Sequence, residues 1–295
     1  MFVQYFGKYL VENNIISQPE YELIIKEQEN SRVKLGFIAV AERLLTKRQA
    51  EELNELQKTK DQRFGDLAIE KGYLLEEELN YLLNMQGNPY MKFIQTLTEE
   101  SIMTMDEIED ALRNFSIDSN FSSSDLDDLL SNDIDRILPV FIDVDVPIQG
   151  ECISLFIRNI IRLIDNNIMV KKAYSTKEYS FGNLAYQKVV GDYNIFVGLA
   201  SQDDELLTIA NPFARENFTV MNEDSFDSVC EFINCINGLY ASKLSLEEIN
   251  VDMTPPLYQQ NKTISSSDEI YVVPIIINNK QSDLLFTLDS TVNFN

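Results

Sequence analysis

The chain contains no histidine and no tryptophan, and its 295 residues include only 3 cysteines. The absence of histidine excludes Ser-His-Asp and Cys-His nucleophilic catalysis and any histidine-ligated metal site. The cysteines Cys152, Cys230 and Cys235 show no metal-binding spacing and lie in apolar stretches. We therefore expect them to be small core residues in a reducing compartment, and we expect no metal or cofactor bound by the chain itself.

Basic residues are scarce, because 24 Lys and Arg stand against 48 Asp and Glu for a net charge of −24. Such a chain repels duplex nucleic acid and anionic membrane surfaces, so neither is an expected partner. Apolar runs long enough to insert into a membrane are absent, and residues 1–14 lack the features of a signal peptide. The sequence therefore predicts a cytoplasmic protein, with room for about two domains.

An internal repeat occupies residues 5–86, with copies at 5–28, 34–57 and 63–86. The landmarks that recur every 29 residues are Phe6, Leu35 and Phe64, then Gly7, Gly36 and Gly65, then Gln28, Gln57 and Gln86. Each copy predicts a short helix, a turn and a longer helix. The longer helices of the first two copies start with the capping pairs Ser17/Glu20 and Thr46/Gln49. Stacked units of this kind bury a shared apolar stripe, so we expect an all-helical repeat domain over residues 1–90.

The repeat resembles the GspE/MshEN N-terminal domains of type II secretion and pilus-assembly ATPases, whose tandem motifs begin Arg-Leu-Gly. The third copy begins Arg63-Phe64-Gly65 and the second begins Lys34-Leu35-Gly36, whereas the first begins Tyr5-Phe6-Gly7 and has no cation. The resemblance implies that the second and third of these motifs bind cyclic di-GMP as an effector. The alternative is that the glycines serve helix packing and that the domain docks onto a secretion or motility partner.

A connector is expected over residues 91–138, after the Gly87-Asn88-Pro89 stop signal. Thr98–Phe115 predicts one helix, and the Ser- and Asp-rich residues 116–124 predict a flexible linker. A short helix from Ser124 to Leu138 follows. The C-terminal domain then covers residues 139–295.

Helical and strand-like runs alternate in the C-terminal domain. Gly150–Ile164 predicts an apolar helix whose Leu155, Ile160, Leu163 and Ile164 are buried. Strands are predicted at 184–190, 193–200, 205–210, 249–253, 269–277 and 282–288, the last two joined by an Asn278-Asn279 turn. With a second helix at 224–240, this order predicts an α+β domain in which two helices cover one mainly antiparallel sheet.

The helix predicted at residues 224–240, DSFDSVCEFINCINGLY, has two distinct faces. Its apolar face is made by Phe226, Val229, Ile233, Ile236 and Tyr240. Asp227, Glu231 and Asn234 share another face. There a carboxylate can hold a cation of a partner and a carboxamide can hold a water molecule, although such residues are also common on a merely solvated face. Because Gly238 lowers helix propensity, we expect its backbone to pack closely on a neighbour.

The pattern Asp227-x-x-x-Glu231-x-x-Asn234-x-x-x-Gly238, followed by Pro255-Pro256, resembles the CheC/CheX/FliY chemotaxis phosphatases. The first helix lacks the pattern, because Ser154 and not an asparagine follows Glu151, and this makes the domain more similar to CheX. The resemblance implies two long helices on a mainly antiparallel sheet, a homodimer joined through sheet edges, and removal of the phosphoryl group from a phosphorylated CheY-like response regulator.

The same resemblance implies a role for each site residue. Asn234 would orient a water in line with the phosphorus, Glu231 would pair with a lysine of the regulator, and Asp227 would support them. The Mg²⁺ of the reaction would belong to the regulator. The alternative is a non-catalytic signalling or flagellar-switch-type adaptor, because the same fold also serves assembly.

Overall fold

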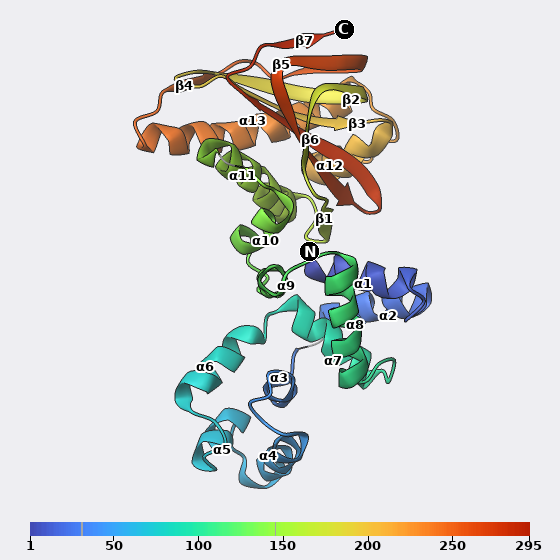
Figure 1. Cartoon of the computed structure of the whole chain (residues 1–295), viewed down its shortest axis with the longest axis vertical. Helices are drawn as coiled ribbons and strands as arrows, with labels where there is room; N and C mark the ends of the chain where they lie inside the picture. The colour runs from blue at the N-terminus through green and yellow to red at the C-terminus, as the bar shows by residue number, and fades with distance from the viewer. Residues whose placement is uncertain (31, 145) are drawn as a thin grey trace. The chain divides into compact units, whose positions relative to one another are not determined.

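The computed structural model describes every residue except Ser31 and Asp145. For residues 28–30 it describes the backbone and not the side chains. The side chain of the predicted landmark Gln28 lies outside the described residues. The chain divides into two compact units, Phe2–Asn132 and Asp133–Asn295 (Figure 1). In the part of the chain that the structure describes, none of the helices is both long enough and apolar enough to cross a membrane.

The described residues of the first unit form helices and the turns between them, without strands. They are α1 (Phe2–Glu12), α2 (Gln18–Asn30), α3 (Leu35–Ala41), α4 (Lys47–Lys60), α5 (Phe64–Glu70), α6 (Glu76–Met85), α7 (Pro89–Glu99), α8 (Met105–Asp118) and α9 (Ser123–Leu130). Each predicted repeat copy forms a short and a long helix, as expected. Both predicted capping pairs are present, since the side chains of Glu20 and Gln49 accept hydrogen bonds from the backbone N–H groups of Ser17 and Thr46.

The 29-residue period continues beyond the predicted copies, into α7 and α8. The turn inside each copy has a residue in the left-handed region at the same repeat position: Asn14 (φ 55°), Arg43 (58°), Gly72 (68°) and Ser101 (57°). Thr104 and Glu107 form the capping box of α8. The prediction of one helix from Thr98 to Phe115 is therefore wrong, because the turn at Ser101 separates two helices that form a further copy of the unit.

The predicted flexible linker at residues 116–124 is also wrong. These residues form the end of α8, a turn and the start of α9, which is capped by the side chain of Ser122 accepting from the N–H of Asp125 at 3.1 Å. Serine and aspartate residues suggested a flexible chain here, but they are also common at helix N-termini. Their short polar side chains bond to free backbone N–H groups there.

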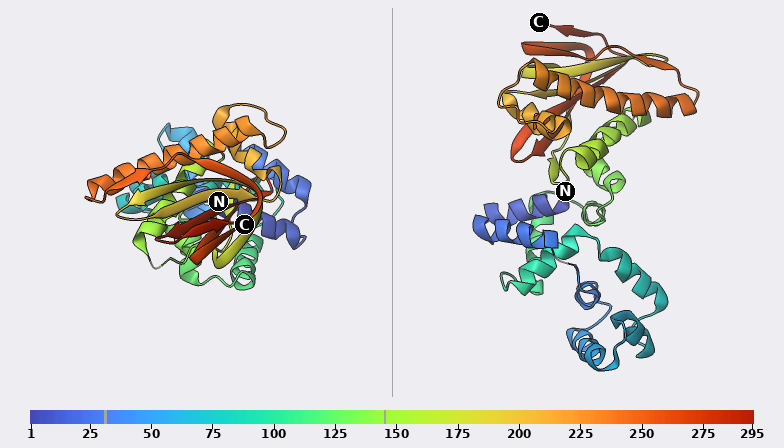
Figure 2. Two further views of the ribbon diagram at one scale, coloured as in Figure 1. Left: turned by 90° about the horizontal axis from the view of Figure 1, so that it is seen from above. Right: turned by 180° about the vertical axis from the view of Figure 1, so that it is seen from behind.

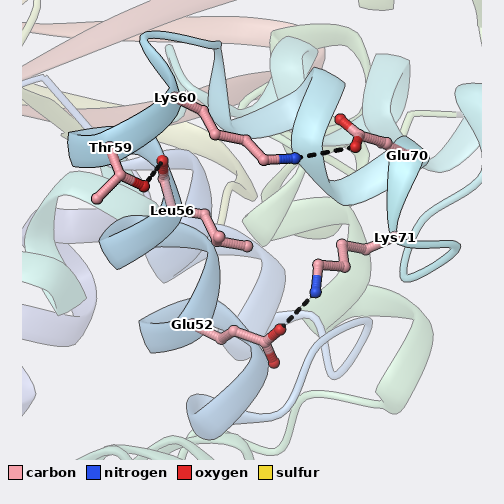
Figure 3. A network of polar contacts seen from close by, with 6 residues as sticks. All are labelled: Glu52, Leu56, Thr59, Lys60, Glu70 and Lys71. Carbon is pink, nitrogen blue, oxygen red and sulfur yellow. Dashed lines mark hydrogen bonds and ion pairs between the residues drawn. The ribbon is translucent and has the colours of Figure 1, made fainter.

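The repeat copies do not pack as the expected simple stack. Copies two and three contact each other through ion pairs between Lys60 and Glu70 (3.0 Å) and between Lys71 and Glu52 (2.9 Å), which join α4 to α5 and the residue that follows it (Figure 3). Copy one packs instead on α7 and α8. That contact is an aromatic cluster of Phe2, Phe6, Phe93 and Phe115. The apolar stripe of the first copy is thus covered by the copy that the sequence prediction missed.

The second unit combines helices with one antiparallel sheet, which confirms the α+β class. Its helices are α10 (Ile134–Phe141), α11 (Pro147–Leu163), α12 (Leu207–Ala214) and α13 (Glu223–Leu246). Its strands are β1 (Ile168–Val170), β2 (Tyr174–Gly191), β3 (Ile195–Ser201), β4 (Val251–Met253), β5 (Leu257–Ile277), β6 (Lys280–Leu288) and β7 (Val292–Phe294). Helix α13 runs along one side of the sheet, and β7 lies on the opposite side (Figures 1 and 2).

The long strands pair in a closed cycle, β2 with β3, β3 with β6, β6 with β5, and β5 with β2 again. Because side chains alternate along a strand, β2 sends Leu184 and Tyr186 into an apolar cluster enclosed by the strands, with Phe294 of β7 packed against it. Gln187, next to Tyr186, belongs to the other face and contacts α13. The sheet therefore presents one face to the helix that carries the candidate site.

Three details of the second unit differ from the sequence predictions. The strand predicted at 205–210 is a short 3₁₀ turn (Asp204–Leu206) followed by α12, since a short apolar run does not distinguish strand from helix. Leu163 is 44% exposed, although it was expected in the core. Cys235 is exposed, whereas Cys152 and Cys230 are buried as predicted. The Asn278-Asn279 turn is confirmed, with φ of 51° and 62°.

Candidate functional site

Helix α13 carries the predicted site and is longer than predicted, starting at Glu223 with Asn222 as its cap and ending at Leu246. Its predicted apolar face is confirmed. The residues on that face are buried: Phe226, Val229, Ile233, Ile236 and Tyr240. On another face Asp227 and Glu231 are exposed and Asn234 is half-buried. The helix therefore brings the two carboxylates and the carboxamide together at the surface.

Glu231 contacts both residues that follow it on this face. Nδ2 of Asn234 donates to its Oε2 at 3.4 Å, and Sγ of Cys235 donates to its Oε1 at 3.7 Å. Burial and then the negative charge of Glu231 raise the pKa of Cys235. Burial and the charge of Asp227 raise the pKa of Cys230 to about 11. Both thiols thus stay protonated at neutral pH, which makes them poor nucleophiles, and the face presents negative charge.

Sequence reasoning missed Gln187 of β2, which lies under this face and is 1% exposed. Its Nε2 donates to Oδ1 of Asn234 and to the backbone carbonyl of Thr254, both at 2.8 Å. Its Oε1 accepts from Nδ2 of Asn237 at 2.9 Å. The available signal was an amide side chain inside the apolar strand predicted at 184–190, where a buried polar group needs partners.

A cavity of about 420 Å³ adjoins the carboxylates. Asp227, Cys230 and Glu231 line it from α13, and Pro256, Leu257 and Tyr258 line it from the other side. Pro256, part of the predicted Pro255-Pro256 element, thus borders the site. Two carboxylates beside an aromatic ring and apolar groups are suited to a long basic side chain, whose stem is apolar and whose end is charged.

Gly238 does not make the close backbone contact that we expected. A Cβ atom placed there would meet only Cε of Met253, at an ordinary 3.7 Å. In the first long helix, α11, the carboxylate of Glu151 forms an ion pair with Lys243 of α13 at 2.6 Å. Glu151 therefore joins the two helices, in agreement with the absence of the site pattern from α11.

The residues predicted to bind cyclic di-GMP lie at the starts of α3 and α5. Lys34 and Arg63 are exposed N-cap residues, and Nζ of Lys34 pairs with Glu99 at 2.7 Å. Leu35 is half-buried and Phe64 is buried. A Cβ atom at Gly65 would lie 2.6 Å from Cδ1 of Leu79, and one at Gly36 would lie 3.0 Å from Cε2 of Phe64. Helix packing thus accounts for both glycines, and nucleotide binding stays a prediction.

Metal binding is a further chemistry that acidic and thiol side chains can offer. Among the residues that the structure describes, no group of three or more Cys, Asp or Glu side chains is arranged to hold a metal ion. The chemistry available at α13 is therefore that of carboxylates and a carboxamide: binding a cation, donating to an acceptor and orienting a water molecule.

The second unit is an α+β domain whose long helix exposes a carboxylate and a carboxamide over an antiparallel sheet. Residues 184–278, from β2 to the end of β5, match the family model described as "Chemotaxis phosphatase CheX". The C-terminal half of the chain therefore contains a CheX/CheC-like domain, and α13 with all of its site residues lies inside the matched segment.

Several solved structures are similar to about half of the chain. A CheC-like superfamily protein from Shewanella sp. PV-4 is 16% identical with a TM-score of 0.44, over 49% of this chain and 99% of its own. The chemotaxis protein CheX from Desulfovibrio desulfuricans is 15% identical with a TM-score of 0.42, over 48% and 99%. A chain of the CheX–CheY–BeF₃–Mg²⁺ complex from Borrelia burgdorferi is 15% identical with a TM-score of 0.40, over 48% of this chain and 98% of its own. Comparison with curated proteins gave no match.

Proposed function

We propose that this protein removes the phosphoryl group from the aspartyl phosphate of a CheY-like response regulator. The observation that carries the proposal is the surface pair of Glu231 and Asn234 on α13, inside the segment that matches the CheX family model. Hydrolysis of an aspartyl phosphate needs little covalent work from the protein, because positioning and electrostatics supply most of the catalysis of phosphoryl transfer.

Each site residue then has one task. Glu231 binds a lysine of the regulator, which is a charge-assisted contact at the surface. Asn234 enters the regulator's phosphorylation site and orients a water in line with the phosphorus, and the Mg²⁺ there is bound by the regulator. Asp227 adds negative charge beside the cavity that Glu231 borders. The N-terminal repeat unit regulates this activity or docks the phosphatase to a partner.

The test is the lifetime of a phosphorylated CheY-like regulator with and without the full chain. We expect wild type to shorten the lifetime, Asn234→Ala to abolish the effect while regulator binding persists, and Glu231→Gln to weaken binding and turnover together. Ser242→Ala, an exposed change two turns further along α13, is the matched control and should act like wild type. Binding without any acceleration by wild type would reject the phosphatase and favour the adaptor alternative.

A further inference from the structure

Three carboxamides meet where β2 passes beneath α13. Gln187 and Asn237 are each 1% exposed, and Asn234 lies at the edge of this buried group. Gln187 is the centre, since it bonds to both asparagines and to the carbonyl of Thr254. Burial of so many polar groups is costly unless they are paired, so their arrangement is specific and not interchangeable with an apolar contact.

One backbone atom determines the orientation of all three amide groups, that is, which side of each carries the oxygen and which the nitrogen. The carbonyl oxygen of Thr254 can only accept a hydrogen bond, so the Gln187 atom 2.8 Å from it must be Nε2. The same Nε2 lies 2.8 Å from Asn234, whose facing atom must therefore be the acceptor Oδ1. Oε1 of Gln187 then faces Asn237, which donates through Nδ2. Because Oδ1 of Asn234 points to Gln187, its Nδ2 points to Glu231.

The anchoring carbonyl is itself held against β2. The N–H of Thr254 donates to the carbonyl of Lys188 at 2.9 Å, and its hydroxyl donates to the same oxygen at 3.0 Å. Proline at position 255 further restricts the backbone of Thr254 to extended conformations. Thr254 is therefore held by hydrogen bonds to β2, the strand that contains Gln187. These bonds fix the distance between the carbonyl of Thr254 and the side chain of Gln187.

We infer that Gln187 is the positioning residue for Asn234: it holds the carboxamide in one orientation, with Oδ1 toward β2 and Nδ2 toward Glu231. The catalytic consequence rests on the proposed function. When Glu231 turns to a cation of the regulator, Nδ2 of Asn234 loses its acceptor, but Oδ1 remains held by Gln187. The amide therefore arrives at the phosphorylation site already oriented, and no torsional freedom of Asn234 has to be lost during the reaction.

Without Gln187, the terminal amide group of Asn234 is free to rotate by 180° about its last side-chain bond. The torsion of a terminal amide is broad and roughly two-fold, so both orientations would be populated and a water would be held correctly only part of the time. We expect Gln187→Met, which keeps the length of the side chain and removes its hydrogen bonds, to lower kcat by about 5- to 50-fold. KM should change by less than about two-fold, because Glu231 still binds the regulator.

The experiment measures kcat and KM for dephosphorylation of a CheY-like regulator by the full chain. The control is Ser242→Ala, on the exposed part of α13, because the Ser242 hydroxyl bonds to the carbonyl of Gly238 and not to Gln187 or Asn234. Its kcat should stay near wild type. Unchanged kcat in Gln187→Met, or an equal loss in Ser242→Ala, would overturn the inference.

A second measurement needs neither activity nor a folded Gln187 variant. Both Nε2 protons of Gln187 are bonded in a buried site, so in nuclear magnetic resonance spectra of wild type they should exchange slowly with water. Asn234→Ala should accelerate one of them and leave the proton bonded to Thr254 slow. Fast exchange of both in wild type would overturn the inference. If wild type fails to dephosphorylate any regulator but the exchange pattern holds, the proposed function fails and the orientation of Asn234 stands.

Discussion

The ring of Tyr258 lies flat against the ring of Phe226, with centroids 4.3 Å apart and planes 9° apart. Phe226 is buried in α13, whereas Tyr258 at the start of β5 is 39% exposed and lines the cavity beside Asp227 and Glu231. The stack thus fixes one wall of the cavity to the core of the domain. A side chain entering from a partner would meet a rigid aromatic surface opposite two carboxylates.

Tyr258→Ala should weaken binding of the phosphorylated regulator by about three- to ten-fold, because it removes an aromatic contact and opens the cavity. The kcat at saturating regulator should change little, since Asn234 is untouched. Surface plasmon resonance against the phosphorylated regulator measures the affinity. Tyr174→Ala is the control, because Tyr174 is 47% exposed in the same unit and lies outside the cavity. Equal weakening by both variants would show that the stack has no part in binding.

Gly238→Ala should stabilise the second unit by about 0.5–1 kcal/mol, because alanine has the higher helix propensity and the added Cβ has room. The contrast is Gly198 in β3, where a Cβ would lie 2.8 Å from Cδ1 of Leu184 and 3.2 Å from the carbonyl of Ala185. Gly198→Ala should therefore destabilise by about 1–3 kcal/mol. Urea unfolding of both variants measures the two effects, and a loss of stability in Gly238→Ala would mean that the backbone there is held by a contact we have not identified.

The sequence predictions succeeded for features that depend on residues within a single helix or turn. The two faces of α13 follow from helical spacing, and the Asn278-Asn279 turn follows from residues that tolerate positive φ. Gln187 could not be placed, because its role comes from Thr254 and Asn234, which are distant in sequence and meet it only in the folded sheet.

The further repeat copy was missed for a different physical reason. The prediction relied on the glycine landmark, and the further copy carries Ile94, 2% exposed, at that position. All of these copies retain the turn residue, at Asn14, Arg43, Gly72 and Ser101. The hydroxyl cap is retained at Ser17, Thr46 and Thr104, and the third copy has Leu75 in its place. These positions set the angle between the two helices, while the residue at the glycine position only sets how closely they approach.

Alkaline pH should reveal the buried contact between Tyr179 and Asp283, in which the phenol donates to the carboxylate. Burial and then this bond raise the pKa of Tyr179 above its usual value. As pH rises past about 10, the unfolded state loses its phenolic proton before the folded state does, so stability falls. Below that pH, Tyr179→Phe should be less stable than wild type by about 1–3 kcal/mol, because Asp283 loses a donor.

Melting temperatures from pH 7 to 11 test this. The deficit of Tyr179→Phe should be constant up to about pH 9 and should shrink above pH 10, where only the wild type loses the contribution of this tyrosine. Parallel curves over the whole range would mean that Tyr179 titrates alike in the folded and unfolded chain.

The predicted cyclic di-GMP site has a test that follows from the ion pair of Lys34 with Glu99. If Lys34 binds a phosphate, its ammonium must first leave Glu99, so Glu99→Gln should tighten binding several-fold, and Arg63→Ala should abolish it. Glu109→Gln is the matched control, because it releases Arg43, which lies outside the predicted set, from an ion pair of 2.6 Å. Isothermal titration of the full-length variants measures all three. Since packing against Phe64 and Leu79 already accounts for Gly36 and Gly65, absence of heat in both wild type and Glu99→Gln would leave a protein partner as the ligand of the repeat unit.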